Sequence, residues 1–198
     1  MRLINFILVI FLILTNGIKA NTDTEILENL KNGGYIIFIR HAYAPGGGDP
    51  ENFDINNCST QRNLDNSGRL QSKEIGNFFL KNKIPVEQVL SSEWCRCKET
   101  SEIAFLNFKT KKFLNSFFSE KFQKNKSQQM KKLKNFINNW KSDKNLILVT
   151  HYVVILETLN YAPSSGEIVV SDKNFNMCGP PSIPLSFILA NVLPRWIT

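Results

Sequence analysis

The chain has 198 residues, of which 42% are hydrophobic and 21% are charged, a length and composition typical of one globular domain. Its formal net charge is +7, and the excess is local, because residues 106–144 hold eleven lysines and only two acids. These lysines form no nucleic-acid-binding motif and alternate with no aromatic stacking pattern, so we expect no nucleic-acid partner. They indicate a solvated face, or a surface that contacts anionic substrates or an anionic membrane.

The first twenty residues form a separate segment. Met1-Arg2 is positive, residues 3–14 are apolar apart from Asn5, and a more polar stretch ends at Ala20. This is the layout of a secretory signal peptide. An uncleaved anchor is the alternative, but this stretch of twelve residues is too short for a bilayer that needs about 20. We expect cleavage near Ala20, export to the periplasm or medium, and one mature domain over residues 21–198.

Helices and strands are predicted to alternate along the rest of the chain. Asp65 is placed to cap one helix, and continuous apolar runs such as residues 35–39 are typical of strands buried on both faces. Helices are expected at 25–30, 66–81, 94–106, 127–140 and 153–159, and strands at 35–39, 86–90, 146–149 and 168–170.

This alternation predicts an α/β fold with a mostly parallel central sheet and helices on both of its faces. The segment 106–144 is too short to hold a large cap, so we expect a single compact domain with an open pocket. The tail, residues 180–198, is apolar and interrupted by prolines, and the sequence assigns it no element.

The two histidines of the chain occupy equivalent positions. His41 comes at the end of the strand expected at 35–39, and His151 comes at the end of the strand expected at 146–149. In open α/β sheets, ligands bind in the crevice at the carboxyl ends of the strands. We therefore expect both imidazoles to face one crevice.

Three arginines are placed near the same edge of the sheet. Arg40 directly precedes the first histidine, Arg96 follows the strand expected at 86–90, and Arg62 lies just before the helix expected at 66–81. A guanidinium can bind two oxygens of a phosphate, and a helix start adds backbone N–H donors. An isolated arginine is usually a surface residue, but this grouping indicates a phosphate-binding site.

Four short motifs follow one another along residues 35–160: Arg40-His41-Ala42, Arg62-Asn63-Leu64 with Gly68, Ser91-Ser92 with Arg96 and Thr100, and Thr150-His151. In this order they resemble the histidine phosphatase superfamily, the clan of phosphoglycerate mutases and acid phosphatases, and in particular its short members with an Arg-His-Ala motif. The resemblance implies that His41 is a nucleophile that forms a phosphohistidine. It also implies that no metal or cofactor takes part, and that the phosphate is bound by Arg40, Arg62, Arg96 and His151.

Phosphoryl transfer needs these residue types on chemical grounds as well. A phosphoryl group carries about −1.5 to −2 charges at neutral pH, so cations must neutralise it before a nucleophile can approach. A neutral imidazole is nucleophilic near pH 7, and a covalent intermediate divides hydrolysis into two easier steps. We expect an exported phosphatase that acts on small or surface-displayed phosphomonoesters. The branch resembling lipopolysaccharide core heptose phosphatases would add an envelope glycan or glycolipid phosphate as substrate.

No residue is evident as the general acid that would protonate the leaving oxygen. Acid phosphatases carry an aspartate directly after the second histidine, where this chain has Tyr152. Glu120 lies in the segment in which mutase-like relatives carry their acid, although a glutamate among lysines is usually a solvated partner. The loop acids Asp49, Glu51 and Asp54 are the other candidates. Because no acid is evident, a catalytically weak relative that only binds phosphorylated ligands is the alternative function.

The four cysteines are an even number, which is typical of disulfides in an exported protein. Their spacing is not that of zinc ligands, so we expect no metal site. Cys58 lies four residues before Arg62, and Cys95 and Cys97 flank Arg96. If both arginines contact one phosphate, their neighbours are close in space. We therefore expect a disulfide from Cys58 to Cys95 or Cys97.

Overall fold

The structure is a computed structural model that describes residues 25–179 and residue 183. The expected signal peptide and most of the tail, at 180–182 and 184–198, lie outside the described residues. Among the helices of the described part, none is long and apolar enough to cross a membrane.

A five-stranded sheet forms the centre of the described chain, in the order β3-β2-β4-β1-β5. All neighbouring strands are parallel except β5, which runs antiparallel to β1 at one edge. The prediction of an α/β fold with a mostly parallel sheet is confirmed. The strands are β1 (Ile36–Arg40), β2 (Val86–Ser91), β3 (Lys109–Thr110), β4 (Asn145–Thr150) and β5 (Ile168–Ser171).

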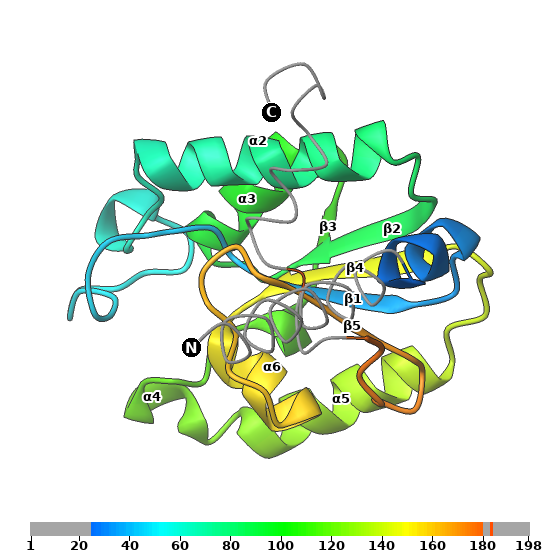
Figure 1. Cartoon of the computed structure of the whole chain (residues 1–198). Coiled ribbons are helices and arrows are strands. Elements are labelled where there is room, and N and C mark those ends of the chain that lie inside the picture. Colours follow the sequence, from blue (N-terminus) through cyan, green and yellow to red (C-terminus); the bar gives the residue numbers. More distant parts are fainter. Residues whose placement is uncertain (1–24, 180–182, 184–198) are drawn as a thin grey trace, which may run out of the picture.

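Helices cover both faces of this sheet. Figure 1 shows α2 and α3 on one side and α5 and α6 on the other. Residues 25–32 are also helical. The remaining elements are η1 (Cys58–Thr60), α2 (Asn66–Lys81), α3 (Cys95–Phe105), η2 (Lys112–Leu114), α4 (Glu120–Gln123), α5 (Lys126–Asn138) and α6 (Tyr152–Leu159).

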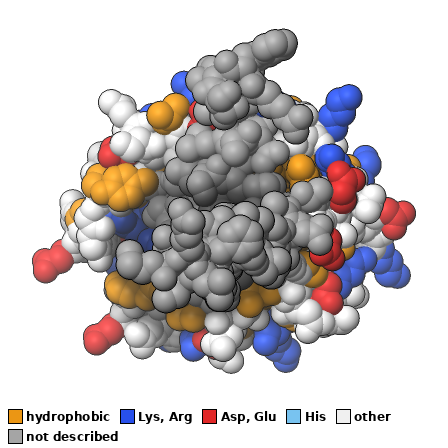
Figure 2. All heavy atoms as spheres, in the orientation of Figure 1, with side chains coloured by type: hydrophobic (Ala, Val, Ile, Leu, Met, Phe, Trp, Pro, Cys, Tyr) orange, Lys and Arg blue, Asp and Glu red, His pale blue; other side chains and the backbone are white. Residues whose placement is uncertain are grey.

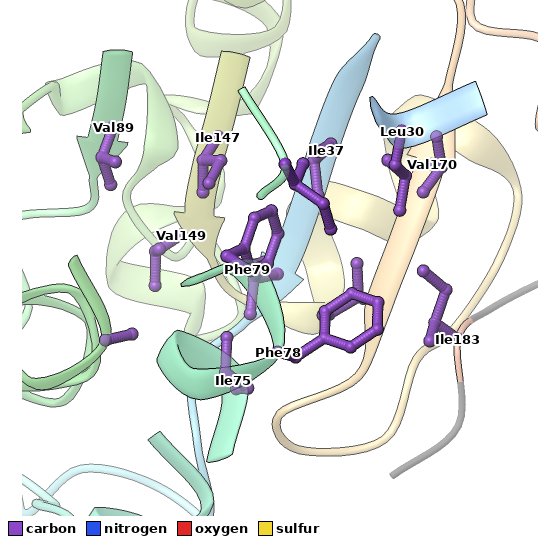
Figure 3. Close-up of a cluster of buried hydrophobic side chains, with 14 of the residues drawn as sticks. Leu30, Ile37, Ile75, Phe78, Phe79, Val89, Ile147, Val149, Val170 and Ile183 are labelled. Carbon is purple, nitrogen blue, oxygen red and sulfur yellow. The ribbon is translucent and has the colours of Figure 1, made fainter. Parts of the chain in front are cut away.

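The core has two halves because the strands are apolar on both faces. Side chains of a strand point alternately to opposite faces, so Ile37 and Ile39 pack with α2 while Ile36 and Phe38 pack on the α5 and α6 side. In Figure 3 the aromatic rings of α2 and the aliphatic side chains of the sheet meet in the first half. Burying each such side chain contributes about 1.5–3 kcal/mol. The sheet is therefore a rigid support for whatever follows its strands.

The carboxyl ends of three strands meet at one edge of the sheet. In the β1–β4 pair Arg40 lies opposite Thr150, and in the β2–β4 pair Ser91 lies opposite Val149. The next backbone amides continue this pairing: the N–H of His41 donates to Thr150 O at 2.9 Å. Residues that follow β1, β2 and β4 therefore emerge side by side.

Candidate active site

A cavity of about 530 Å³ lies over this edge of the sheet. The polar part of its lining holds the five residues that the sequence analysis assigned to phosphate chemistry. The lining also includes a loop after β1, Gly46 to Asp49, and a group of aromatic side chains. The five predicted residues are Arg40, His41, Arg62, Arg96 and His151, and the aromatic ones are Phe53, Trp94, Phe118, Phe122 and Tyr152.

His41 is held in one tautomer. Its Nδ1 lies 2.8 Å from Ala42 O, which can only accept, so Nδ1 carries the proton. Its Nε2 lies 3.2 Å from Nε of Arg96, which can only donate, so Nε2 presents a lone pair. Burial, and after it the charge of Arg96, holds the pKa of His41 well below its usual range. His41 is therefore a neutral imidazole whose unprotonated Nε2 faces Arg96.

His151 adopts the complementary arrangement from the end of β4. Its Nδ1 accepts from Nη2 of Arg96 at 3.4 Å, so Nε2 carries the proton and donates to Ser92 Oγ at 2.9 Å. Burial and the charge of Arg96 also keep its pKa well below the usual value. The two imidazole rings lie 5.5 Å apart between centroids, as expected for side chains that share one crevice.

Arg40 and Arg62 retain hydrogen-bonding capacity inside the cavity. Arg40 donates through Nη1 to Pro163 O at 2.9 Å, and its guanidinium lies 5.6 Å from the centroid of the Tyr152 ring. Arg62 donates through Nη1 to the carbonyls of Ala44 and Gly46. Within the described part of the chain, the Nε atoms of both arginines are buried without an acceptor. Burial lowers the pKa of both groups, and neighbouring arginine charge lowers it further. Such donors fit an anion.

Arg96 is the most central of the three arginines and only 3% exposed. It comes from the first turn of α3 and faces both imidazoles. Its other side forms an ion pair with Asp49, whose Oδ1 lies 2.7 Å from Nη1. The arrangement can hold a tetrahedral oxyanion beside a nucleophilic nitrogen, which is the requirement for phosphoryl transfer.

The backbone after His41 is fixed from α2 and α3. Thr100 Oγ1 in α3 accepts from the N–H of Ala42 at 3.0 Å. Gly68, in the first turn of α2, lies against Tyr43, and a Cβ at this position would come within 2.0 Å of Tyr43 O. Both residues belong to the motifs described above. Their roles here are to hold the chain that follows His41.

A disulfide joins Cys58 in η1 to Cys95 at the start of α3. The prediction that Cys58 pairs with a cysteine beside Arg96 is confirmed, and Cys95 is the partner. Cys97 is a buried free thiol 3.5 Å from His151 Nε2, and burial raises its pKa to about 12. Cys178 is also free. The bridge ties the loop that carries Arg62 to the helix that carries Arg96.

The carboxylates considered as general acids lie in different places. Glu120 is exposed at the start of α4 and is not in the cavity lining, although Ser119 and Lys121 are. Glu51 lines the cavity at an exposed position, whereas Asp54 is outside the lining. Asp49 lines the cavity as the partner of an arginine. Glu120 is therefore not brought together with the histidines, because α4 turns its first residue outward.

No cluster of three or more histidines, cysteines or acids suited to a metal ion occurs among residues 25–179 and 183.

Comparison with known proteins gives a fold. No family model and no curated protein matches the chain. The structure of the protein histidine phosphatase SixA complexed with tungstate matches with a TM-score of 0.53 and 16% identity, covering 75% of this chain and 96% of that chain. The chain has the histidine phosphatase fold.

Two further structures agree with this assignment. An open-reading-frame product from Mycobacterium tuberculosis has a TM-score of 0.51 at 13% identity, covering 69% of this chain and 89% of its own. A candidate phosphohistidine phosphatase SixA from Agrobacterium tumefaciens has a TM-score of 0.50 at 15% identity, covering 75% and 99%.

Within this histidine phosphatase fold, the sequence analysis missed three contacts of the site. It treated Asp49 only as an acid candidate, whereas the structure pairs it with Arg96. It named Ser92 in a motif but gave it no role, and here Ser92 Oγ accepts from Nε2 of His151 at 2.9 Å. It assigned nothing to Trp94, whose ring lies 5.3 Å from that of His151. The position of Trp94 shortly after the end of β2 was the one feature of the sequence that could have placed it in the site.

Proposed function

We propose that the protein is an exported, metal-independent phosphatase that hydrolyses phosphomonoesters through a phosphohistidine on His41. The observation that carries this proposal is the orientation of the neutral imidazole. Its Nδ1–H donates to Ala42 O, and its unprotonated Nε2 accepts from Nε of Arg96 at 3.2 Å, in a cavity with two further arginines.

The chemistry takes two steps. The phosphoryl oxygens bind the guanidinium groups of Arg40, Arg62 and Arg96, which all line the cavity. Nε2 of His41 attacks phosphorus, the N–P bond forms, and the P–O bond to the leaving group breaks with its electron pair on that oxygen. Water then attacks phosphorus, the N–P bond breaks with its electron pair on Nε2, and inorganic phosphate leaves with the oxygen and the protons of that water. Positive charge beside the reacting phosphoryl group stabilises both transition states.

The leaving group decides how much acid catalysis the site must provide. Burial alone would raise the pKa of Asp49, but the hydrogen bond and charge of Arg96 outweigh it and hold that pKa below its usual value. Asp49 is therefore ionised at neutral pH and has no proton to give. Glu51 is exposed and Glu120 lies outside the lining. We infer that esters whose leaving oxygen departs without protonation, such as aryl phosphates, are hydrolysed faster than alkyl esters, among them glycan and glycolipid phosphates.

A protein that binds phosphorylated ligands without efficient turnover is the second candidate. The lack of a general acid favours this candidate as well. Among the described lining residues the carboxylates are Asp49 and Glu51, and Asp49 is ionised. Such a protein would bind phosphate or tungstate but would release no phosphate even from an activated ester. Turnover of an aryl phosphate therefore separates the two candidates.

Export is supported by the disulfide between Cys58 and Cys95, because such bridges persist in oxidising compartments. An anionic envelope glycan or glycolipid phosphate fits the exposed lysines of α5, Lys131, Lys132 and Lys134. On the face in Figure 2, however, basic side chains lie among acidic ones. A contact between these lysines and an anionic membrane is therefore supported only by the local excess of lysine. It is tested by whether the protein binds anionic vesicles but not neutral ones.

The function is tested with the purified protein on 4-nitrophenyl phosphate and on an alkyl phosphate. We expect turnover of the aryl ester, much slower turnover of the alkyl ester, and no effect of EDTA. Arg96→Ala and His151→Ala should each reduce kcat/KM by about 10²-fold, because both remove stabilisation of the transition state. His41→Ala should abolish turnover. Normal activity of His41→Ala, or inhibition by EDTA that a divalent metal reverses, would contradict the proposal.

A further inference from the structure

We propose that Asp49 is a positioning residue that holds Arg96 in the orientation in which it binds the phosphoryl group. This inference rests on the proposed function and assigns a role to the one anion that the cavity places against its central cation. A carboxylate in a phosphate pocket repels the substrate, so its presence needs an explanation.

The contacts of Arg96 divide its guanidinium into two sides. Asp49 takes one side with both oxygens, Oδ1 at 2.7 Å from Nη1 and Oδ2 at 3.2 Å from Nη2. Nη1 also donates to Arg62 O at 3.3 Å. The opposite side faces the imidazoles, with Nε 3.2 Å from His41 and Nη2 3.4 Å from His151. The planar fork of arginine makes these sides interdependent: fixing one side aims the other at the nucleophile.

Asp49 is itself anchored by groups other than the arginine side chain. Its Oδ1 accepts from the backbone N–H of Arg62 at 3.0 Å, and its Oδ2 accepts from Nε1 of Trp94 at 3.0 Å. Trp94 is buried and precedes α3 as its N-cap residue. A carboxylate that merely occupied the phosphate position until substrate arrived would need to leave easily. These two donors keep Asp49 in place when a phosphoryl group binds on the histidine side.

The effect of Asp49→Asn on anion binding differs in sign between two cases, one in which only the charge of Asp49 matters and one in which Asp49 positions Arg96. Removing a negative charge from an anion-binding cavity strengthens anion binding if charge alone matters. If Asp49 positions Arg96, the same change weakens anion binding, because asparagine presents only one acceptor oxygen to the guanidinium fork. The sign of the change in anion affinity therefore decides between the two.

The experiment measures inhibition of aryl phosphate turnover by tungstate, together with kcat and KM, in the wild type and five variants. Asp49→Asn should weaken tungstate binding and lower kcat/KM, each by about tenfold, the effect of losing a charge-assisted hydrogen bond. Asp49→Glu, which restores the charge, should recover part of both. Glu51→Gln removes a charge from the same lining without touching Arg96, so tungstate should bind it as tightly as wild type or more tightly.

Two further measurements show that Asp49 acts through Arg96. Arg96→Lys cannot form the two-pronged contact, so adding Asp49→Asn to it should cost little more tungstate affinity than Arg96→Lys alone. Tungstate affinity measured by calorimetry, on variants whose thermal melts are cooperative, separates this effect from unfolding.

Tighter tungstate binding by Asp49→Asn, or additive losses in the double variant, would overturn the proposal. If the wild type neither binds tungstate nor hydrolyses an aryl phosphate, the proposed function fails and the role of Asp49 fails with it. If the wild type does both and only the Asp49 results differ from expectation, the positioning role alone is rejected.

Discussion

Gly68 lies directly against the backbone of Tyr43, so closely that a Cβ on Gly68 would come within 2.0 Å of Tyr43 O and 3.0 Å of its carbonyl carbon. The atoms that would clash are backbone, so no side-chain rotation relieves the contact. Tyr43 is two residues after His41. We therefore expect Gly68→Ala to move the chain beside the nucleophile, lowering kcat/KM at least tenfold and stability by about 1–3 kcal/mol, as overpacking does.

Steady-state kinetics and thermal melts of Gly68→Ala test this relationship. The matched control is Gly47→Ala, because a Cβ on Gly47 has no neighbour within 4 Å. Its melting temperature should equal that of the wild type. A Gly68→Ala protein with wild-type kinetics and melting temperature would show that the loop and α2 do not constrain each other.

Reduction of the Cys58–Cys95 bridge should destabilise the protein. The bridge spans 37 residues of sequence, for which the chain-entropy relation gives about 4 kcal/mol. Cys58→Ala should lose a similar amount and should also lower kcat/KM, because Cys95 adjoins Arg96. Guanidinium unfolding of the oxidised, reduced and Cys58→Ala proteins measures the effect.

Cys178→Ser is the control for the loss of a thiol, since Cys178 is free in the structure. Equal stability of the oxidised and reduced proteins would show that the bridge does not constrain the folded domain.

Stability should fall as the pH is lowered below about 6.5, the ordinary pKa of histidine in an unfolded chain. Both histidines have pKa values well below this in the folded protein, first because they are buried and then because Arg96 is near. At a pH between the folded-state and unfolded-state pKa values, the unfolded chain binds more protons than the folded protein, so lowering the pH favours unfolding. The full free energy of unfolding is therefore reached only at a pH above the unfolded-state pKa.

Denaturant unfolding between pH 5 and 8 measures this dependence. The slope should approach about 2.7 kcal/mol per pH unit below pH 6.5 when two histidines contribute, and His151→Asn should halve it. Asp49, with its lowered pKa, contributes in the same direction but at lower pH, below about 3.9. A flat profile from pH 8 to 5 would mean that the histidines are not buried as neutral groups.

The main elements could be predicted because local patterns and packing agree in them. The apolar runs became β1 and β4, and Asp65 caps α2 by accepting from the N–H of Gly68. β3 could not be predicted, because its two residues, Lys109 and Thr110, are exposed and carry no strand pattern. The antiparallel direction of β5 depends on how the loop after α6 returns to the sheet, which no short pattern encodes.

The residues of the site could be predicted where they follow a strand, and Arg62, on a loop, could be predicted from its position before α2 and from the motif resemblance. The contacts that loop residues make could not be predicted. The strand ends place His41, His151 and Arg96 at one edge by geometry alone. The contact between Asp49 and Arg96 joins residues 47 positions apart through a glycine-rich loop whose course depends on tertiary packing. Glu120 was chosen by its position in a segment, and that segment folds with Glu120 exposed.

The most direct test of the phosphohistidine mechanism is to trap the intermediate. The protein is mixed rapidly with an aryl phosphate that carries radiolabelled phosphorus, quenched in alkaline detergent, and digested for mass spectrometry. We expect label that survives base, is lost in acid, and maps to His41, with none in His41→Ala. Label on a serine, threonine or carboxylate, or rapid turnover by His41→Ala, would contradict nucleophilic catalysis by this histidine.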